Sequence, residues 1–235
     1  MLSTESSPEV ISKKRSFLPS SLIVSTWESV EGYYSDLNKR EINNSADLRT
    51  WLTNRSELDS MIQEDIAWRY IRMSCDTTNK SYSESFNFFV SEIEPKIAPF
   101  NNALNKKLLD CPFLNDLNDP RMEIMIRNIK KQVEIFREEN IPLFAELQQK
   151  EQHFATIAGA MTVEVDGNEI TLQQAANFLK SNDRKIREDV YRKIVARRLN
   201  DRDQLDQLFD ELVALRHKIA LNAGFDNYRD YMMKS

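Results

Sequence analysis

The feature that most constrains the fold is a long apolar pattern in the segment "SYSESFNFFVSEIEPKIAPFNNALNKKLLDCP". Its apolar positions alternate four- and three-residue steps, namely Tyr82, Phe86, Phe89, Ile93, Ile97, Phe100, Leu104 and Leu108. A helix has 3.6 residues per turn, so these side chains share one helical face. Pro95 and Pro99 interrupt the segment, and each removes an amide donor and clashes with the preceding turn. We expect a kink or break there, with two helical pieces sharing one buried face.

Apolar stripes of the same kind predict helices around residues 27–37, 122–136, 143–158, 186–194 and 205–222. The stripes include Trp27, Val30, Tyr34 and Leu37, then Met122, Met125, Ile129, Val133 and Phe136, then Ile186, Val190 and Ile194, and finally Leu205, Leu208, Leu212, Leu215 and Ile219. Only four of 235 residues are glycine, against a usual share of roughly 7%. Scarce glycine suits long helices and argues against glycine-rich phosphate loops.

Local signals indicate where helices begin and end. "NNSADLRTWL" is typical of a loop followed by a helix start, and Ser56 with Asp59 resembles a capping box for a further start. Asp183 can cap the helix that follows it. Gly224 suits the left-handed position just after a helix.

One segment, "MTVEVDGNEITLQQA", alternates apolar and polar residues around Asp166 and Gly167. This pattern predicts a β-hairpin with a type I′-like turn. Thr171 with Gln174 then forms a capping box that opens a helix. The predicted fold class is therefore mostly α, a multi-helix array with one short β-hairpin near residues 161–171.

The chain divides into three parts in this interpretation. Residues 1–16 are polar, rich in serine and aperiodic, which predicts a disordered leader. Residues 17–158 form an amino-terminal helical region, and residues 159–235 contain the hairpin and further helices. After Gly224, "FDNYRDYMM" begins a new apolar pattern that no later segment could bury. We therefore expect that the sequence is a truncation of a longer protein.

Bulk properties favour a cytoplasmic protein. No stretch approaches the roughly 18 apolar residues that cross a bilayer, and the start lacks the apolar core of a secretion signal. Cys75 and Cys111 show no pairing pattern, which fits a reducing compartment. The net charge of −5 argues weakly against a dedicated nucleic-acid binder.

The candidate reactive residues give no catalytic pattern. His153 and His217 are the two histidines, and they are far from the four-residue spacing of a helical zinc site. Cys75 and Cys111 lack a cationic neighbour in sequence and are predicted to be ordinary buried or half-buried thiols. Glu64 and Asp65 are adjacent, so on a helix they point about 100° apart and do not converge on one substrate atom. No catalytic, cofactor-binding or metal-binding residue is assigned to this chain.

A basic run, "DRKIREDVYRKIVARRLNDRD", offers two interpretations. Residues 184–202 carry eight Lys or Arg against the acids Glu188, Asp189 and Asp201. Such a face could bind RNA or a peptide carboxylate. The favoured alternative is a charged helix face with ion pairs such as Glu188 with Arg192, since the run lacks the interleaved aromatic residues of a single-strand platform.

Several segments resemble the oligoendopeptidase F branch of the thimet-oligopeptidase-like zinc metallopeptidases. They are "SFLPSSLIVSTWESVEGYYSDLNKREINNSADLRTWLTNRSELDSMIQEDIAWRYIRMSCDTTN", "FREENIPLFAELQQ", "GAMTVEVDGNEITLQQA" and "RRLNDRDQLDQLFDELVALRHKIALNAGFDNYRDY". The similarity spans about residues 17–231. It implies a mostly helical fold whose two halves enclose a channel for short peptides. In this family an H-E-x-x-H helix and a further glutamate in the second half hold zinc, and no counterpart of these ligands occurs here.

The resemblance implies that this chain is the amino-terminal, substrate-channel half of a cytoplasmic zinc oligopeptidase, inactive by itself. Its expected partners are short peptides and the missing carboxy-terminal catalytic half, with no nucleic acid and no membrane. Zinc is expected in the intact family enzyme and not in this chain. The alternative is a standalone helical module that binds peptides or proteins without catalysis.

Overall fold

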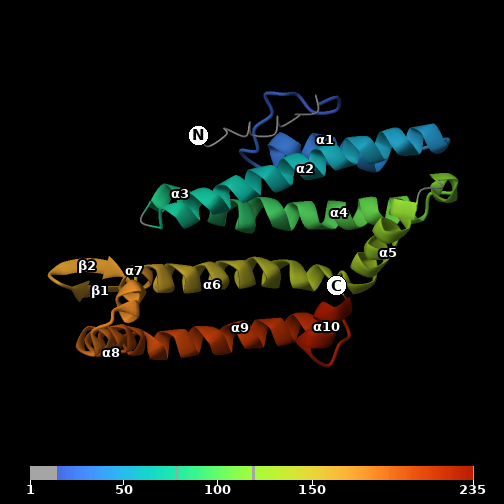
Figure 1. Ribbon diagram of the computed structural model, residues 1–235. Helices are drawn as coiled ribbons and strands as arrows, with labels where there is room; N and C mark the ends of the chain where they lie inside the picture. Colours follow the sequence, from blue (N-terminus) through green and yellow to red (C-terminus); the bar gives the residue numbers. More distant parts are fainter. Residues whose placement is uncertain (1–14, 78, 118–119, 235) are drawn as a thin grey trace.

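The computed structural model describes residues 15–77, 79–117 and 120–234 as two layers of long helices (Figure 1). The predicted leader at residues 1–16 lies mostly outside these described residues. In the first layer, the helices are α1 (Glu28–Lys39), α2 (Ser45–Cys75), α3 (Lys80–Phe88) and α4 (Glu94–Leu109). Helix α5 (Pro120–Ile135) crosses at one end to the second layer, where α6 (Ile141–Gly159) and α9 (Arg202–Asn222) run side by side (Figure 1).

The remaining elements lie at the ends of the second layer. They are the strands β1 (Thr162–Val165) and β2 (Asn168–Thr171), and the helices α7 (Leu172–Ala176), α8 (Arg184–Asn200) and α10 (Tyr228–Lys234). Short 3₁₀ turns occupy Leu114–Leu117, Glu138–Asn140 and Asn177–Lys180. The mostly helical class with one short hairpin is therefore confirmed. Among the described residues, no helix is both long enough and apolar enough to cross a bilayer.

Among the described residues, two large apolar cores stabilise the two layers, and a third, small cluster consists of Met73, Phe86 and Val90. The first lies between α1, α2 and α4 and includes Trp51, Tyr34 and Leu104, all essentially inaccessible to solvent. The second lies between α6, α8, α9 and the hairpin and is centred on Val190 and Ile219. Burial of apolar surface is the main driving force for folding, so each layer carries much of its own stability.

The predicted interruption of the long apolar face is a π-helical segment, Phe89–Ile93, that separates α3 from α4. Pro95 follows it in the first turn of α4, where an amide donor is not needed, and Pro99 lies inside α4. The face stays continuous across the break, since Phe89 and Ile93 are buried on it. Tyr82 is an exception to the prediction because it is exposed at the beginning of α3.

The hairpin and its exit agree with the local sequence signals. Asp166 and Gly167 both have positive φ, 52° and 76°, as a type I′ turn requires. The strands pair with Val163 opposite Ile170. The Thr171 hydroxyl accepts a hydrogen bond from the backbone N–H of Gln174, and the Gln174 side-chain oxygen accepts one from the backbone N–H of Thr171. The predicted capping box is therefore confirmed.

The second helix start predicted at Ser56 is wrong. Helix α2 runs unbroken through this position, and its start is capped by Asn44, whose side chain accepts from the Asp47 amide. Asp59 instead pairs with Arg55, one turn earlier on the same helix. No glycine or proline separates Ser45 from Cys75, so nothing in the backbone chemistry ends the helix at the second signal.

Other outcomes concern the later stripes. Asp183 caps α8 as predicted, but Ile186 is exposed and only Val190 and Ile194 of that stripe are buried. The apolar residues after Gly224 were predicted to have no later segment of the chain to bury them. Earlier helices cover some of them, because Tyr231 is buried in the second core and packs edge-on against Phe225.

Candidate functional site

The two histidines do not form a metal site. His153 is exposed on α6, with its Nε2 atom 3.4 Å from the side-chain nitrogen of Gln204 near the start of α9. His217 is exposed on the same helix as Gln204, and the interval from position 204 to position 217 corresponds to roughly 20 Å of helix. Across residues 15–77, 79–117 and 120–234, no group of three or more His, Cys, Asp or Glu side chains could hold a metal ion. The described residues therefore do not fit a zinc ion.

The cysteines also lie apart. Cys111 is buried in the first core, as predicted for an ordinary thiol. Cys75 is exposed, so the prediction that it is buried or half-buried is wrong. It is the last residue of α2, where the chain leaves the helix, and the apolar face of α2 ends at Met73.

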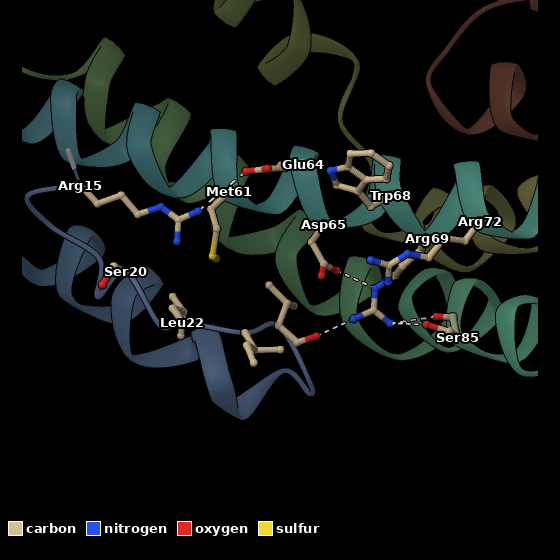
Figure 2. A pocket seen from close by; sticks show the side chains of 12 residues that line it. Arg15, Ser20, Leu22, Met61, Glu64, Asp65, Trp68, Arg69, Arg72 and Ser85 are labelled. Atoms are coloured by element: carbon tan, nitrogen blue, oxygen red, sulfur yellow. Dashed lines mark hydrogen bonds and ion pairs between the residues drawn. The ribbon is translucent and has the colours of Figure 1, made fainter. Parts of the chain in front are cut away.

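Glu64 and Asp65, which are adjacent on α2, pair with different cations, one in the segment before α1 and one on α2 itself. Figure 2 shows Arg15 reaching Glu64, at 3.8 Å, while Asp65 accepts from Nε of Arg69 at 2.6 Å. These groups line a hollow of about 380 Å³ between α2, α3 and the segment that precedes α1. The two carboxylates therefore have separate ion-pair partners.

Arg69 is the centre of this hollow, and its guanidinium is fully engaged. Besides Asp65, it donates to the backbone carbonyl and hydroxyl of Ser85, at 3.0 and 2.9 Å, and to the Val24 carbonyl at 2.5 Å. It also lies over the Phe89 ring, 5.5 Å from the centroid. These contacts join three segments of the first layer, so the hollow is better explained as a structural tie than as a ligand site.

The basic run lies on α8 and the first residue of α9, and three of its eight cations pair with its own acids. Glu188 pairs with Arg192 at 2.7 Å, as predicted, and Asp189 pairs with Lys193 at 2.9 Å. Asp201 pairs with Arg197 at 2.5 Å. These pairs support the interpretation of a charged helix face over that of an RNA surface.

A groove between the layers has a different character. One hollow of about 410 Å³ lies between α2, α3 and α6 and includes Tyr70 and Phe86, and a second of about 370 Å³ continues it along α6. Gln152 lines both hollows, so they form one groove. Within the described structure, no hydrogen bond occupies the side-chain amides of four lining residues, namely Gln63, Asn87, Gln149 and Gln152. Each amide offers both donors and an acceptor to a ligand.

Next to this groove, a pocket of about 350 Å³ surrounds Glu94, the first residue of α4. Gln148 lines the pocket and the groove, and its amide donates to the Glu94 carboxylate at 3.0 Å. Most of the wall is apolar and includes Val90, Ile135 and Phe144. Burial raises the pKa of Glu94, against the opposing effect of the Gln148 hydrogen bond.

Sequence reasoning missed both the groove and the Glu94 pocket. A signal for the pocket was available, because Val90, Glu94 and Ala98 follow a four-residue spacing that places a carboxylate among small and apolar side chains of one helical face. The groove had no such signal. Its amides come from α2, α3 and α6, and only the packing of these helices brings them together.

A comparison with solved structures shows that this chain has a fold also found in peptidases. A structure of PZ peptidase A with an inhibitor matches with a TM-score of 0.82 and 18% identity over 88% of this chain. Two oligoendopeptidase F structures, one from Bacillus anthracis strain Ames, match with TM-scores of 0.83 and identities of 19% and 20% over 88% of this chain. The chain spans 37% or 38% of the length of these structures.

A sequence match over the first layer and α5 relates the chain to a peptidase family. Residues 21–136 match the model of the Peptidase M3 N-terminal domain. A search of curated protein sequences gives no match. The resemblance to the oligoendopeptidase F branch is therefore confirmed for the amino-terminal part, and the fold is a partial domain relative to the larger peptidase chains.

Proposed function

We propose that this chain is the amino-terminal, peptide-holding part of a cytoplasmic zinc-dependent oligopeptidase. The observation that carries the proposal is the match of residues 21–136 to the Peptidase M3 N-terminal domain. Peptidases of this family are generally metal-dependent, and the part of this chain that the structure describes does not fit a zinc site. The zinc chemistry is therefore assigned to polypeptide corresponding to the remaining length of the larger peptidase chains.

The groove supports a role in holding short peptides. An extended peptide has one donor and one acceptor per residue, so side-chain amides can satisfy its backbone without reading its sequence. Gln149 and Gln152 supply such groups from α6, and Asn87 supplies one from α3. Tyr70, which is 52% exposed, adds apolar surface for side chains of the peptide. The groove therefore fits a peptide of varied sequence better than it fits a phosphate or a metal.

The first experiment measures turnover. The purified 235-residue chain is mixed with an internally quenched short peptide and zinc, and no chelator-sensitive cleavage is expected. Cleavage that a chelator abolishes would refute the division of labour between this chain and the rest of the enzyme. Sequencing the coding DNA downstream of codon 235 in all frames adds an independent test, with an H-E-x-x-H helix as the expected result.

The second experiment measures binding to the groove by titrating a labelled short peptide. The double variant Gln149→Ala/Gln152→Ala removes one exposed and one half-buried amide from the groove, and we expect it to weaken binding at least fivefold. Gln173→Ala, an exposed glutamine on α7 that does not line the groove, is the matched control. Equal affinities for the two variants would remove the groove from the proposal.

A second candidate function is a standalone module that binds proteins without catalysis. It is favoured by an exposed apolar stripe on α9, where Phe209, Val213 and Leu221 are 61%, 47% and 53% exposed. Surface stripes of this kind often mark interaction sites. The downstream DNA distinguishes the two functions, because the standalone module predicts that no metal-binding helix follows in any frame.

A further inference from the structure

The pocket around Glu94 combines an acidic group with an apolar wall. Val90 and Ile135 are buried, and Phe144 and Tyr231 complete the wall from α6 and α10. Among the described residues that line the pocket, Glu94 is the carboxylate and Arg137 is the cation. Such a combination is selective, since an apolar ligand without a positive charge would cover the half-buried carboxylate without supplying a counter-charge.

Arg137 is committed to the protein itself. Its guanidinium donates to the carbonyls of Glu134 and Phe136 at 2.9 and 2.7 Å, and to the Ala223 carbonyl at 3.4 Å. No ion pair between Arg137 and Glu94 occurs in the described structure. The partner that Glu94 does have is the neutral Gln148 amide, which leaves the negative charge of the carboxylate uncompensated.

The backbone around Glu94 is also unusual. The π-helical segment Phe89–Ile93 ends immediately before it, and π-helical turns occur frequently at functional sites. Val90 lies within this segment, and Glu94 comes four residues after Val90, directly after the segment ends. The irregular turn therefore determines how both side chains enter the pocket. An interruption that only accommodated Pro95 would not require an acidic residue at this position.

We propose that the Glu94 pocket binds the first residue of a short peptide, with the α-ammonium group at the Glu94 carboxylate and an apolar side chain against the wall. The inference rests on the proposed function, because the shared Gln148 wall would let the rest of the peptide continue into the groove. A volume of about 350 Å³ accommodates one large apolar residue and excludes most of a longer chain.

The test uses phenylalaninamide, which has the ammonium group and the apolar side chain but no further peptide. Titration calorimetry with the 235-residue chain should show saturable binding. N-acetylphenylalaninamide, which lacks the positive charge, should bind at least tenfold more weakly. Glu94→Gln should weaken phenylalaninamide binding by a similar factor while leaving the weak binding of the acetylated compound unchanged.

Glu92→Gln is the matched control, since Glu92 is an exposed glutamate two positions earlier that does not line the pocket. Circular dichroism verifies that both variants fold. The inference is overturned if phenylalaninamide does not bind, or if it binds Glu94→Gln and Glu92→Gln equally well. Labelled peptides that still bind the amide groove in that case would preserve the proposed function and remove only the ammonium pocket.

Discussion

Replacement of Arg69 by methionine tests how the first layer is held together. Methionine keeps most of the apolar stem of the side chain but removes every guanidinium hydrogen bond. The carboxylate of Asp65 and the carbonyls of Val24 and Ser85 then lose their donor. Arg69 is the residue that joins the segment before α1 to both α2 and α3, so the effect should reach beyond one helix.

The expected loss can be estimated from the contacts. A hydrogen bond to a charged group contributes about 1.5–3 kcal/mol, and a neutral one about 0.5–1.5 kcal/mol. The Arg69 and Asp65 side chains are 14% and 25% exposed, so water can replace part of what is removed. A net loss of about 2–4 kcal/mol follows, which lowers Tm by roughly 5–15 °C in a chain of this size.

The assay is thermal unfolding followed by circular dichroism, with Arg72→Met as the control. Arg72 lines the same hollow, is exposed, and has no side-chain hydrogen bond or ion pair in the described structure. Its replacement should change Tm by no more than about 2 °C. Adding Asp65→Asn to Arg69→Met should recover part of the loss, because it removes the unpaired carboxylate. Equal Tm values for Arg69→Met and Arg72→Met would refute the structural role of Arg69.

Four further substitutions test other parts of the chain. Gly167→Ala should lower stability by about 1 kcal/mol because φ is +76° at this position. Gly32→Ala should instead raise stability by up to about 1 kcal/mol, because Gly32 lies inside α1 with open space around it. Thermal melts of both variants separate the two effects. Trp51→Phe removes a fully buried indole that donates to the Leu37 carbonyl at 2.8 Å. We expect the free energy of unfolding, measured in denaturant, to fall by about 2–3 kcal/mol. A fall of less than about 1 kcal/mol would contradict this prediction. Burial raises the folded-state pKa of Glu94, so folding favours the protonated carboxyl, and this contribution to stability is lost as the pH rises through the folded pKa. The Tm of the parent protein, taken relative to that of Glu94→Gln, should therefore fall between about pH 4 and pH 8. A difference in Tm that stays constant over this range would contradict the pKa shift.

Local signals in the sequence predicted local structure well. The Asp166–Gly167 turn, the Thr171 capping box and the Asp183 cap each depend on backbone groups within a few residues, and all three are present. The same kind of signal failed at Ser56, because a capping pattern has an effect only where the preceding residues leave the helix. Here α2 continues through the signal. Capping residues thus indicate a possible start, and the continuity of the helix decides whether the start is used.

The candidate sites could not be predicted in the same way. Glu94 and Gln148 are 54 positions apart, and their hydrogen bond depends on the packing of α4 against α6. That packing in turn depends on the π-helical turn at Phe89–Ile93, which the two prolines suggested only as an unspecified kink. Periodicity identifies which face of a helix is apolar, but it does not identify which second helix will cover that face.

The end of α9 links the second core to the Glu94 pocket. The buried side chain of Asn140 donates to the Ile219 carbonyl at 3.0 Å and accepts from Asn222 at 2.8 Å, and it thereby satisfies backbone and side-chain groups at a helix terminus. This contact fixes the point from which the chain continues to α10 and to Tyr231, which lines the pocket. The pocket therefore combines residues within the family match, such as Glu94, with a wall from residues beyond position 136. Because the second layer supplies Gln148, Phe144 and Tyr231, a fragment limited to residues 21–136 would keep the carboxylate but not the enclosure that makes it selective.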